Sequence, residues 1–137
     1  MIKEIIHDPF MLSLKSEKAD AGDIQTAQDL ADTLAANREH CVGMAANMIG
    51  VRKCIIAFYD GKNIITMFNP EIIKAEKPYD TEEGCLSLTG GPRPVKRFDR
   101  IKVRWQNEKM QERIKNFSGL PAQIIQHETD HCNGILI

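Results

Sequence analysis

The chain has 137 residues, of which 42% are hydrophobic, so we expect residues 1–137 to form one domain around a single core. Eighteen basic and nineteen acidic residues give a net charge of −1, which argues against DNA or any other partner held chiefly by bulk electrostatics. Four irregularly spaced cysteines without a CxxC pair indicate reduced thiols in a cytoplasmic protein. No signal peptide is expected, and no apolar run approaches the roughly 20 residues of a membrane span.

An amphipathic helix is predicted over residues 23–39. Asp23 is a plausible N-cap, and apolar residues then recur at helical spacing, which indicates a stripe that faces the core. The stripe consists of Ile24, Ala27, Leu30, Ala31, Leu34 and Ala35.

Two β-branched and aromatic runs, at residues 54–59 and 64–68, predict a pair of strands. Asp60-Gly61 between them is typical of a hairpin turn, and Asn69-Pro70 is expected to end the second strand. Further short strands are expected at residues 72–75, 101–105 and 113–117.

A final helix is predicted near the end of the chain, with Pro121 in its first turn and Gly134 just past its last. Together these elements predict an α+β fold in which antiparallel strands surround this C-terminal helix. The helix carries the string Gln126-His127-Glu128-Thr129-Asp130-His131.

This string contains the HExxH pattern, which is typical of hydrolytic metal sites. His127 and His131 lie one turn apart on one helix face, so both imidazoles can reach one ion, and Glu128 can act on a bound water. A catalytic site of this kind usually has three protein ligands and an open position. The pattern therefore requires a third ligand.

We expect the third ligand upstream. The six residues after His131 contain no carboxylate and no histidine, and the adjacent Cys132 points about 100° away around the helix. The candidates are the acidic residues and Cys41, Cys54, Cys85, His7 and His40. Cys85 has the most distinctive setting, because it follows Gly84, where a backbone can approach a ligand closely.

Two motifs of this chain resemble those of the peptide deformylase family. That family combines Glu-Gly-Cys-Leu-Ser with Gln-His-Glu-x-Asp-His, and both occur here without departure, at residues 83–87 and 126–131. Residues 6–9, Ile-His-Asp-Pro, and residues 43–46, Gly-Met-Ala-Ala, also match the family's layout. The resemblance therefore covers nearly the whole chain.

The resemblance implies a peptide-deformylase-like metallohydrolase that removes the N-formyl group from formyl-methionine of nascent polypeptides. It implies Cys85, His127 and His131 as ligands of one divalent ion, with Glu128 as general acid and base. The native ion would be Fe2+, although Zn2+ or Ni2+ could occupy the same ligands. The partners would be nascent formyl-Met peptides, with transient contact to the ribosome.

The resemblance also implies supporting residues. The backbone N–H of Leu86 would donate to the oxyanion. Substrate contacts are expected from Gly43, Met44, Met48, Gly84 and Arg93. Asp130 and Arg97 would pair behind the ligands. The basic residues between positions 93 and 104 are interpreted as a charged outer strand face, with RNA docking as the less favoured alternative.

A third family motif, Gly-x-Gly-x-Ala-Ala-x-Gln, departs from the pattern: Cys41 replaces the first glycine and Met48 replaces the glutamine. In the family the glutamine amide resembles an oxyanion donor, whereas a thioether is only a weak acceptor. Losing one such donor typically costs about 10²- to 10³-fold in rate. Asn47 carries an amide, but it has a shorter reach and points to a different side of the chain.

Two alternative functions therefore stay open. Met48 motivates a catalytically weakened, metal-binding relative that acts as a formyl-peptide or partner-binding module. The altered loop and Thr89, which stands where relatives often have proline, suggest a deacylase for another N-acyl group.

Overall fold

The structure, a computed structural model, describes residues 1–88 and 90–137, so the expectation about Thr89 lies outside the described residues. The helices are α1 (Pro9–Leu12), α2 (Ile24–Ala36) and α3 (Gly119–Cys132), with short 3-10 helices η1 (Ala21–Asp23) and η2 (Ala46–Ile49). The strands are β1 (Gly43–Ala45), β2 (Ile55–Tyr59), β3 (Ile64–Glu83), β4 (Arg93–Gln106) and β5 (Glu112–Ser118).

The strands form one antiparallel sheet in the order β1-β2-β3-β4-β5, so each strand pairs with its neighbours in sequence. The predicted turn between β2 and β3 is confirmed. Asp60 accepts hydrogen bonds from the backbone N–H groups of Lys62 and Asn63, and Gly61 has a φ of 100°, which glycine adopts without strain. The predicted α+β class is confirmed as well.

The prediction that Asn69-Pro70 ends a strand is wrong. β3 continues to Glu83, and its pairing with β4 shifts register between Phe68 and Glu71, where Asn69 has a φ of 53°. The Asn69 side chain bonds to the backbone of Ala19, which stabilises this irregular point. A β-bulge accommodates proline because the ladder is already interrupted there. The strand expected at residues 72–75 is therefore part of β3, and the one at residues 101–105 is part of β4.

Helix α2 is shorter than predicted, since it ends at Ala36. Asp23 stands at its N-cap position, but its side chain does not cap α2; it accepts from the N–H of Asp20 instead, as part of the capping box of η1. Ile24 is 46% exposed and is not part of the core, whereas Leu30 and Leu34 are fully buried. The predicted apolar stripe therefore faces the core only in the middle of the helix, at Ala27, Leu30 and Leu34.

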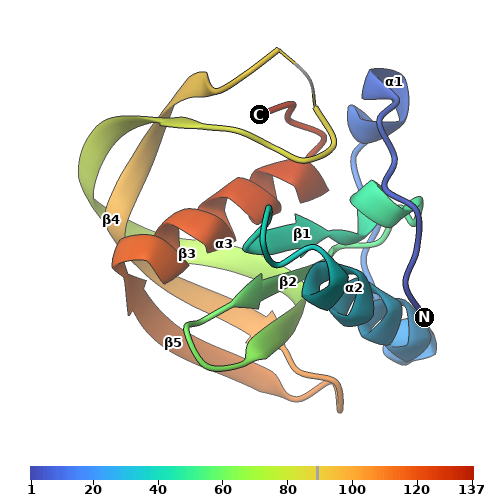
Figure 1. The fold of residues 1–137 in the computed structure, drawn as a ribbon. Coiled ribbons are helices and arrows are strands. Elements are labelled where there is room, and N and C mark those ends of the chain that lie inside the picture. The colour runs from blue at the N-terminus through green and yellow to red at the C-terminus, as the bar shows by residue number, and fades with distance from the viewer. Residues whose placement is uncertain (89) are drawn as a thin grey trace.

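Strand β2 separates two apolar clusters because both of its faces are covered. Ile55 and Ala57 belong to the cluster that contains Leu30 of α2, whereas Ile56 and Phe58 belong to the cluster that contains helix α3 residues. Figure 1 shows α3 crossing the inner side of the sheet, with the long β3–β4 hairpin bending over it. Because of this bend, the residues that follow β3 lie close to α3.

Helix α3 begins and ends where the sequence predicts. Pro121 lies in its first turn, and Gly134, with a φ of 74°, follows the last. A Cβ atom at Gly134 would collide with the carbonyl of Ser13, so the position also requires glycine for lack of space. Polar His127, Glu128 and His131 are buried on this helix, and buried groups of this kind need specific partners.

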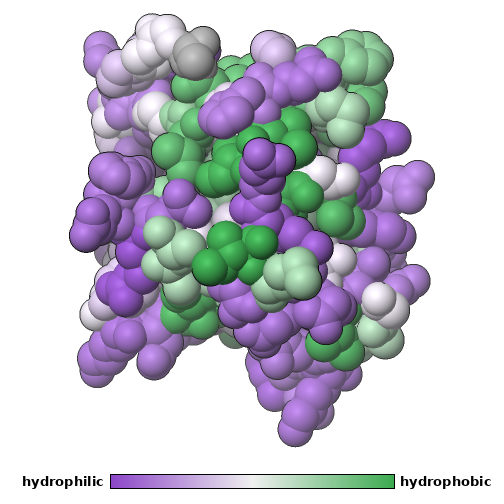
Figure 2. Space-filling model, turned by 45° about the vertical axis from the view of Figure 1, so that its right-hand side comes forward, coloured by the Kyte–Doolittle hydropathy of each residue, from purple (hydrophilic) through white to green (hydrophobic). Residues whose placement is uncertain are grey.

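The surface is mixed in polarity. Large apolar side chains that remain exposed include Ile2, Phe10 and Leu120. Figure 2 shows one face of the molecule, on which apolar groups gather in its central and upper parts among hydrophilic groups. Within the described part of the chain, no helix has both the length and the apolar character needed to cross a membrane.

Candidate metal centre

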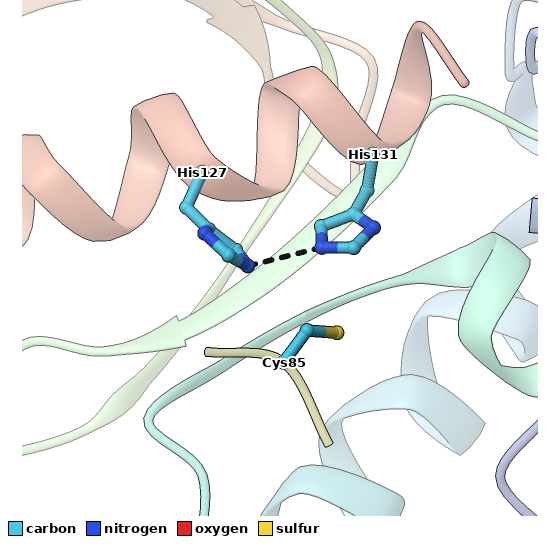
Figure 3. Close-up of side chains that lie close together, drawn as sticks. All are labelled: Cys85, His127 and His131. Carbon is cyan, nitrogen blue, oxygen red and sulfur yellow. Dashed lines mark hydrogen bonds between the residues drawn. The ribbon is translucent and has the colours of Figure 1, made fainter. Parts of the chain in front are cut away.

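Cys85, His127 and His131 come together although the cysteine is far from the histidines in sequence. One potential ligand atom from each residue lies within 4.8 Å of the others. Figure 3 shows the two imidazoles pointing from α3 towards Cys85, which follows the end of β3. The Nε2 atoms of the two histidines are 3.0 Å apart, so both rings present the same type of nitrogen to one point.

The donor set fits a divalent transition-metal ion. One thiol and two imidazoles are the ligand types that such ions accept, and three protein ligands leave a position for reactants. Burial, with the charge on His127 as a second cause, lowers the pKa of His131 to about 3, so that ring is neutral and able to bind an ion. Burial opposes the charge on His127, but hydrogen bonds to Cys85 and Glu83 outweigh burial and raise the pKa to about 10. Because an imidazole coordinates an ion through a deprotonated nitrogen, binding of an ion would compete with this proton.

Glu83 orients His127. Its carboxylate lies 2.7 Å from Nδ1 of the ring, which turns Nε2 towards the other ligands. Gln123 also donates to Glu83, at 2.8 Å. Burial disfavours the charged carboxylate, but hydrogen bonds from His127, Arg97 and Gln123 outweigh burial and hold the pKa of Glu83 at about 2. The sequence reasoning treated Glu83 only as part of a motif and missed this role.

Arg97 joins Glu83 to helix α3. Its guanidinium donates to both Glu83 oxygens, at 2.8 to 3.1 Å, and Nη1 donates to Asp130 at 2.6 Å. A buried arginine with two carboxylate partners avoids the cost of an unpaired charge. The pair predicted between Asp130 and Arg97 is therefore present in the structure, with Glu83 as its unexpected third member.

Glu128 lies beside the ligands and is only 4% exposed. Burial raises the pKa of this carboxyl to about 7. Its Oε1 atom has no hydrogen-bond partner among the described residues. Gly43 lies close by: a Cβ atom there would be 2.5 Å from Ile124 and 3.0 Å from Glu128. The glycine thus allows β1 to pack directly against the carboxylate.

A cavity of about 200 Å³ opens beside this carboxylate. Its walls include the predicted residues Gly43, Met48, Gly84, Leu86 and Cys85. Met48 is fully buried on this wall, so an apolar thioether occupies the position of the family's glutamine.

Several residues expected near the substrate do not line the cavity, and two others do. The Asn47 amide donates to the backbone carbonyl of His131 at 2.9 Å, so it is committed away from the cavity. Within the described residues, neither Met44, whose side chain is fully buried, nor Arg93, at the start of β4, lines the cavity. His40 and Cys41, which were among the candidates for the third ligand, do line it, although neither belongs to the group of three donors.

Chemically, this arrangement defines a centre of the metal-dependent hydrolase type. It combines three donors for one ion with a buried carboxylate at the wall of a cavity. A carboxyl with a pKa near neutrality is suited to accept and return a proton.

Comparison with known proteins identifies the family. The sequence profile described as polypeptide deformylase matches residues 2–137. A peptide deformylase from Clostridium beijerinckii is 52% identical over 137 residues, which is 100% of both chains. One from Heliobacterium modesticaldum is 43% identical over 79% of this chain and 70% of its own. The chain belongs to the peptide deformylase family, a family of hydrolases.

Solved structures agree with this assignment. Peptide deformylase from Thermotoga maritima has a TM-score of 0.88 at 28% identity and covers 99% of this chain and 95% of its own. A class I type b peptide deformylase from Acinetobacter baumannii, with Met-Ala-Ser bound, has a TM-score of 0.88 at 27% identity, with coverage of 99% and 96%.

Proposed function

We propose that this chain is a metal-dependent deformylase that hydrolyses the N-formyl group of formyl-methionine on nascent polypeptides. The observation that carries the proposal is the meeting of Cys85, His127 and His131 beside buried Glu128. Two findings support the substrate class: the full-length similarity to a peptide deformylase, and the Met-Ala-Ser peptide bound to the relative from A. baumannii.

In this proposal Cys85, His127 and His131 hold one divalent ion. Fe2+ is proposed as the native ion, and Zn2+ or Ni2+ would occupy the same donors, because selectivity depends on geometry and supply as well as on ligand type. The bound ion supplies Lewis acidity, which activates water and polarises the formyl carbonyl.

Glu128 is proposed as general base and then general acid. It takes the proton of the attacking water and later gives it to the departing amine, so one group serves both steps. Its pKa of about 7 supports this role, since a carboxyl with this value exchanges protons readily at neutral pH. Gly43 supports it sterically by leaving room for the Glu128 side chain.

The cavity is proposed to receive the methionine side chain. Leu86, Ile124 and Met48 provide apolar walls, and the Leu86 backbone N–H is proposed as a donor to the developing oxyanion. Gly43 and Gly84 are proposed to contact the substrate in the cavity, whereas the contacts predicted for Met44 and Arg93 stay predictions, because neither of these described residues lines it. With Met48 in place of an amide, we expect turnover below that of a site with the full donor set.

The proposal places the chain in the cytoplasm, where nascent chains emerge from ribosomes, and includes transient ribosome contact. These statements follow from the proposed substrate. Co-sedimentation of the protein with ribosomes that carry a nascent chain, compared with empty ribosomes, would test them.

Turnover and metal content measured on one anaerobic preparation test the proposal. The iron-loaded protein should release formate from formyl-Met peptides and leave acetyl-Met peptides intact. A rate equal to that in buffer, with the ion bound, would favour the binding-module alternative that Met48 motivates. Faster cleavage of an acetyl or longer acyl group would favour the deacylase alternative.

Cys85→Ser tests the ligand set separately from turnover. We expect this variant to lose stoichiometric uptake of the ion, because a serine hydroxyl is a far weaker ligand than a thiolate. Cys41→Ser is the matched control, since Cys41 lines the same cavity but is not part of the three-residue donor group. Equal ion content in the two variants would show that the proposed ligand set is wrong.

A further inference from the structure

The N-terminal segment contacts two parts of the chain that line the cavity. The backbone N–H of Ile6 donates to the carbonyl of Met48 in η2 at 2.8 Å. In the next residue, His7, ring atom Nδ1 lies 3.1 Å from the carbonyl oxygen of Ser87. Figure 1 shows this segment, in blue, passing η2. Because Met48 and Leu86 are both wall residues, the segment reaches the cavity wall at two separate places.

The acceptor decides the direction of the His7 hydrogen bond. A carbonyl oxygen only accepts, so Nδ1 of His7 carries a hydrogen and donates it. Ser87 is 1% exposed, and its hydroxyl has no hydrogen-bond partner among the described residues. The hydroxyl therefore does not anchor this residue, and the contact with His7 is made through the Ser87 backbone.

The Ser87 carbonyl belongs to a peptide unit that is held at both ends. Its C=O and the N–H of Leu88 lie in one planar trans unit and point in opposite directions. The N–H of Leu88 donates to the carbonyl of Cys85 at 3.1 Å, which closes a turn with Leu86 and Ser87 at its centre. The ring of His7 thus fixes the orientation of the peptide unit that closes this turn.

Contacts on both sides of His7 hold its backbone in place. Before it, Ile5 packs against the buried apolar cluster that contains Met48, and Leu86 packs against the same cluster. After it, the side chain of Asp8 caps helix α1. The fold therefore presents the His7 ring to the turn, although the ring itself is exposed.

We propose that His7 is a positioning residue, whose ring holds the turn that presents Cys85 and the backbone N–H of Leu86 to the cavity. Among the described residues, His7 belongs neither to the cavity wall nor to the group of three donors, so it acts through the turn. Its effect on catalysis rests on the proposed roles of Cys85 and Leu86, whereas its effect on the turn does not.

Loss of the bond should affect the transition state more than substrate binding. An oxyanion donor acts on charge that develops during the reaction, so a displaced Leu86 N–H lowers kcat and leaves KM nearly unchanged. The net effect of one hydrogen bond corresponds to about 2- to 10-fold in an equilibrium. We therefore expect kcat for formyl-Met peptides to fall by this factor in His7→Leu.

Amide hydrogen exchange of Leu88 tests the positioning role without turnover. It is measured by NMR on the full-length protein supplied with zinc, which takes no part in redox chemistry. In His7→Leu the Leu88 N–H should exchange about 2- to 10-fold faster, because its peptide unit is no longer held at the carbonyl. Amides of β2 should keep the wild-type rate. Unchanged Leu88 exchange, or an equal increase in β2 that reveals a general loss of stability, would overturn the proposal.

His7→Asn is the conservative variant. Its Nδ2 is attached to Cγ, as Nδ1 is in histidine, so the amide can donate to the same carbonyl, whereas leucine has a similar shape and no donor. His7→Asn should therefore keep the slow exchange of Leu88 and the wild-type kcat. Equal behaviour of the Asn and Leu variants would show that the donor is not what holds the turn. Glu4→Ala controls for an exposed change in the same segment and should match the wild type.

The exchange result is independent of the deformylase proposal. A wild type that takes up zinc but cleaves no formyl-Met peptide would remove the proposed function and leave the exchange result standing. Faster Leu88 exchange in His7→Leu with unchanged kcat would overturn the link to Leu86. An increase in KM alone would do the same, because it would place the effect of His7 in substrate binding.

Discussion

Nδ1 of His127 lies 2.7 Å from the carboxylate of Glu83, a residue 44 positions earlier in the chain. The same carboxylate accepts hydrogen bonds from Nε and Nη2 of Arg97. Glu83 thus ties the end of β3 to β4 and α3 at once, and it fixes the ring whose other nitrogen faces Cys85. The arrangement of the proposed ligands therefore depends on this carboxylate.

Removing the charge of Glu83 should weaken metal binding. In Glu83→Gln the His127 ring loses its charged acceptor, and we expect about 10- to 100-fold lower zinc affinity in competition with a chelating dye. Glu82→Gln is the matched control, because Glu82 is an exposed neighbour on the same strand. Equal affinities of the two variants would show that Glu83 does not orient the ligand.

The stability of the metal-free protein should fall at acidic pH because of Glu83. Its pKa is about 2 in the folded protein against an ordinary 4.5. A depressed carboxyl pKa stabilises the fold above the unfolded value, and this contribution is lost as the pH falls from 4.5 towards 2. The contribution is on the order of 3 kcal/mol. Urea unfolding between pH 5 and 2 should show a flatter dependence for Glu83→Gln than for the wild type.

Glu128→Gln should separate chemistry from metal binding. The amide has nearly the same shape but accepts no proton, so we expect turnover of formyl-Met peptides to fall by about 10²- to 10⁴-fold. Ion content should stay stoichiometric, because Glu128 is not one of the three donors that meet within 4.8 Å. Retained turnover would remove Glu128 from the proposed mechanism.

Met48→Gln should raise turnover. Met48 is fully buried on the cavity wall, and Asn47 is already bonded to the His131 carbonyl, so neither provides an amide donor to the cavity. Restoring the amide should increase kcat on the order of tens-fold or more, up to the roughly 10²- to 10³-fold that one oxyanion donor typically contributes. Met48→Leu controls for repacking and should give no increase. If the two variants behave alike, the missing donor does not limit the rate.

Gly43→Ala should destabilise the fold, whereas Gly84→Ala should leave its stability unchanged. A methyl group at Gly43 meets Ile124 at 2.5 Å and Glu128 at 3.0 Å, whereas a methyl at Gly84 meets no described atom within 4 Å. Overpacking of this kind destabilises by about 1–3 kcal/mol, and here it would also displace the carboxylate proposed as the general base. Thermal unfolding of both variants, together with turnover of Gly43→Ala, checks this. A Gly43→Ala protein with unchanged melting temperature and rate would contradict the close packing.

Sequence alone identified the features that local geometry determines. Residues four apart on a helix share a face whatever surrounds them, so the meeting of His127 and His131 was predictable. Asp60-Gly61 was recognisable as a turn for the same reason, because its chemistry is local. The length of β3 was not predictable, since Asn69-Pro70 and the positive φ of Lys77 interrupt an otherwise regular strand, and the strand continues because residues on both sides of these interruptions pair with β4.

Tertiary structure decided which distant groups meet at the site. The motif containing Cys85 indicated a ligand only by resemblance; the bend of the β3–β4 hairpin over α3 is what brings its sulfur to the imidazoles. Tertiary contacts likewise shift the pKa values of two buried carboxyls in opposite directions: three hydrogen-bonding partners lower that of Glu83 against the effect of burial, whereas burial raises that of Glu128. Pairing across a sheet and exclusion of water depend on contacts between remote segments, and no local sequence pattern specifies those.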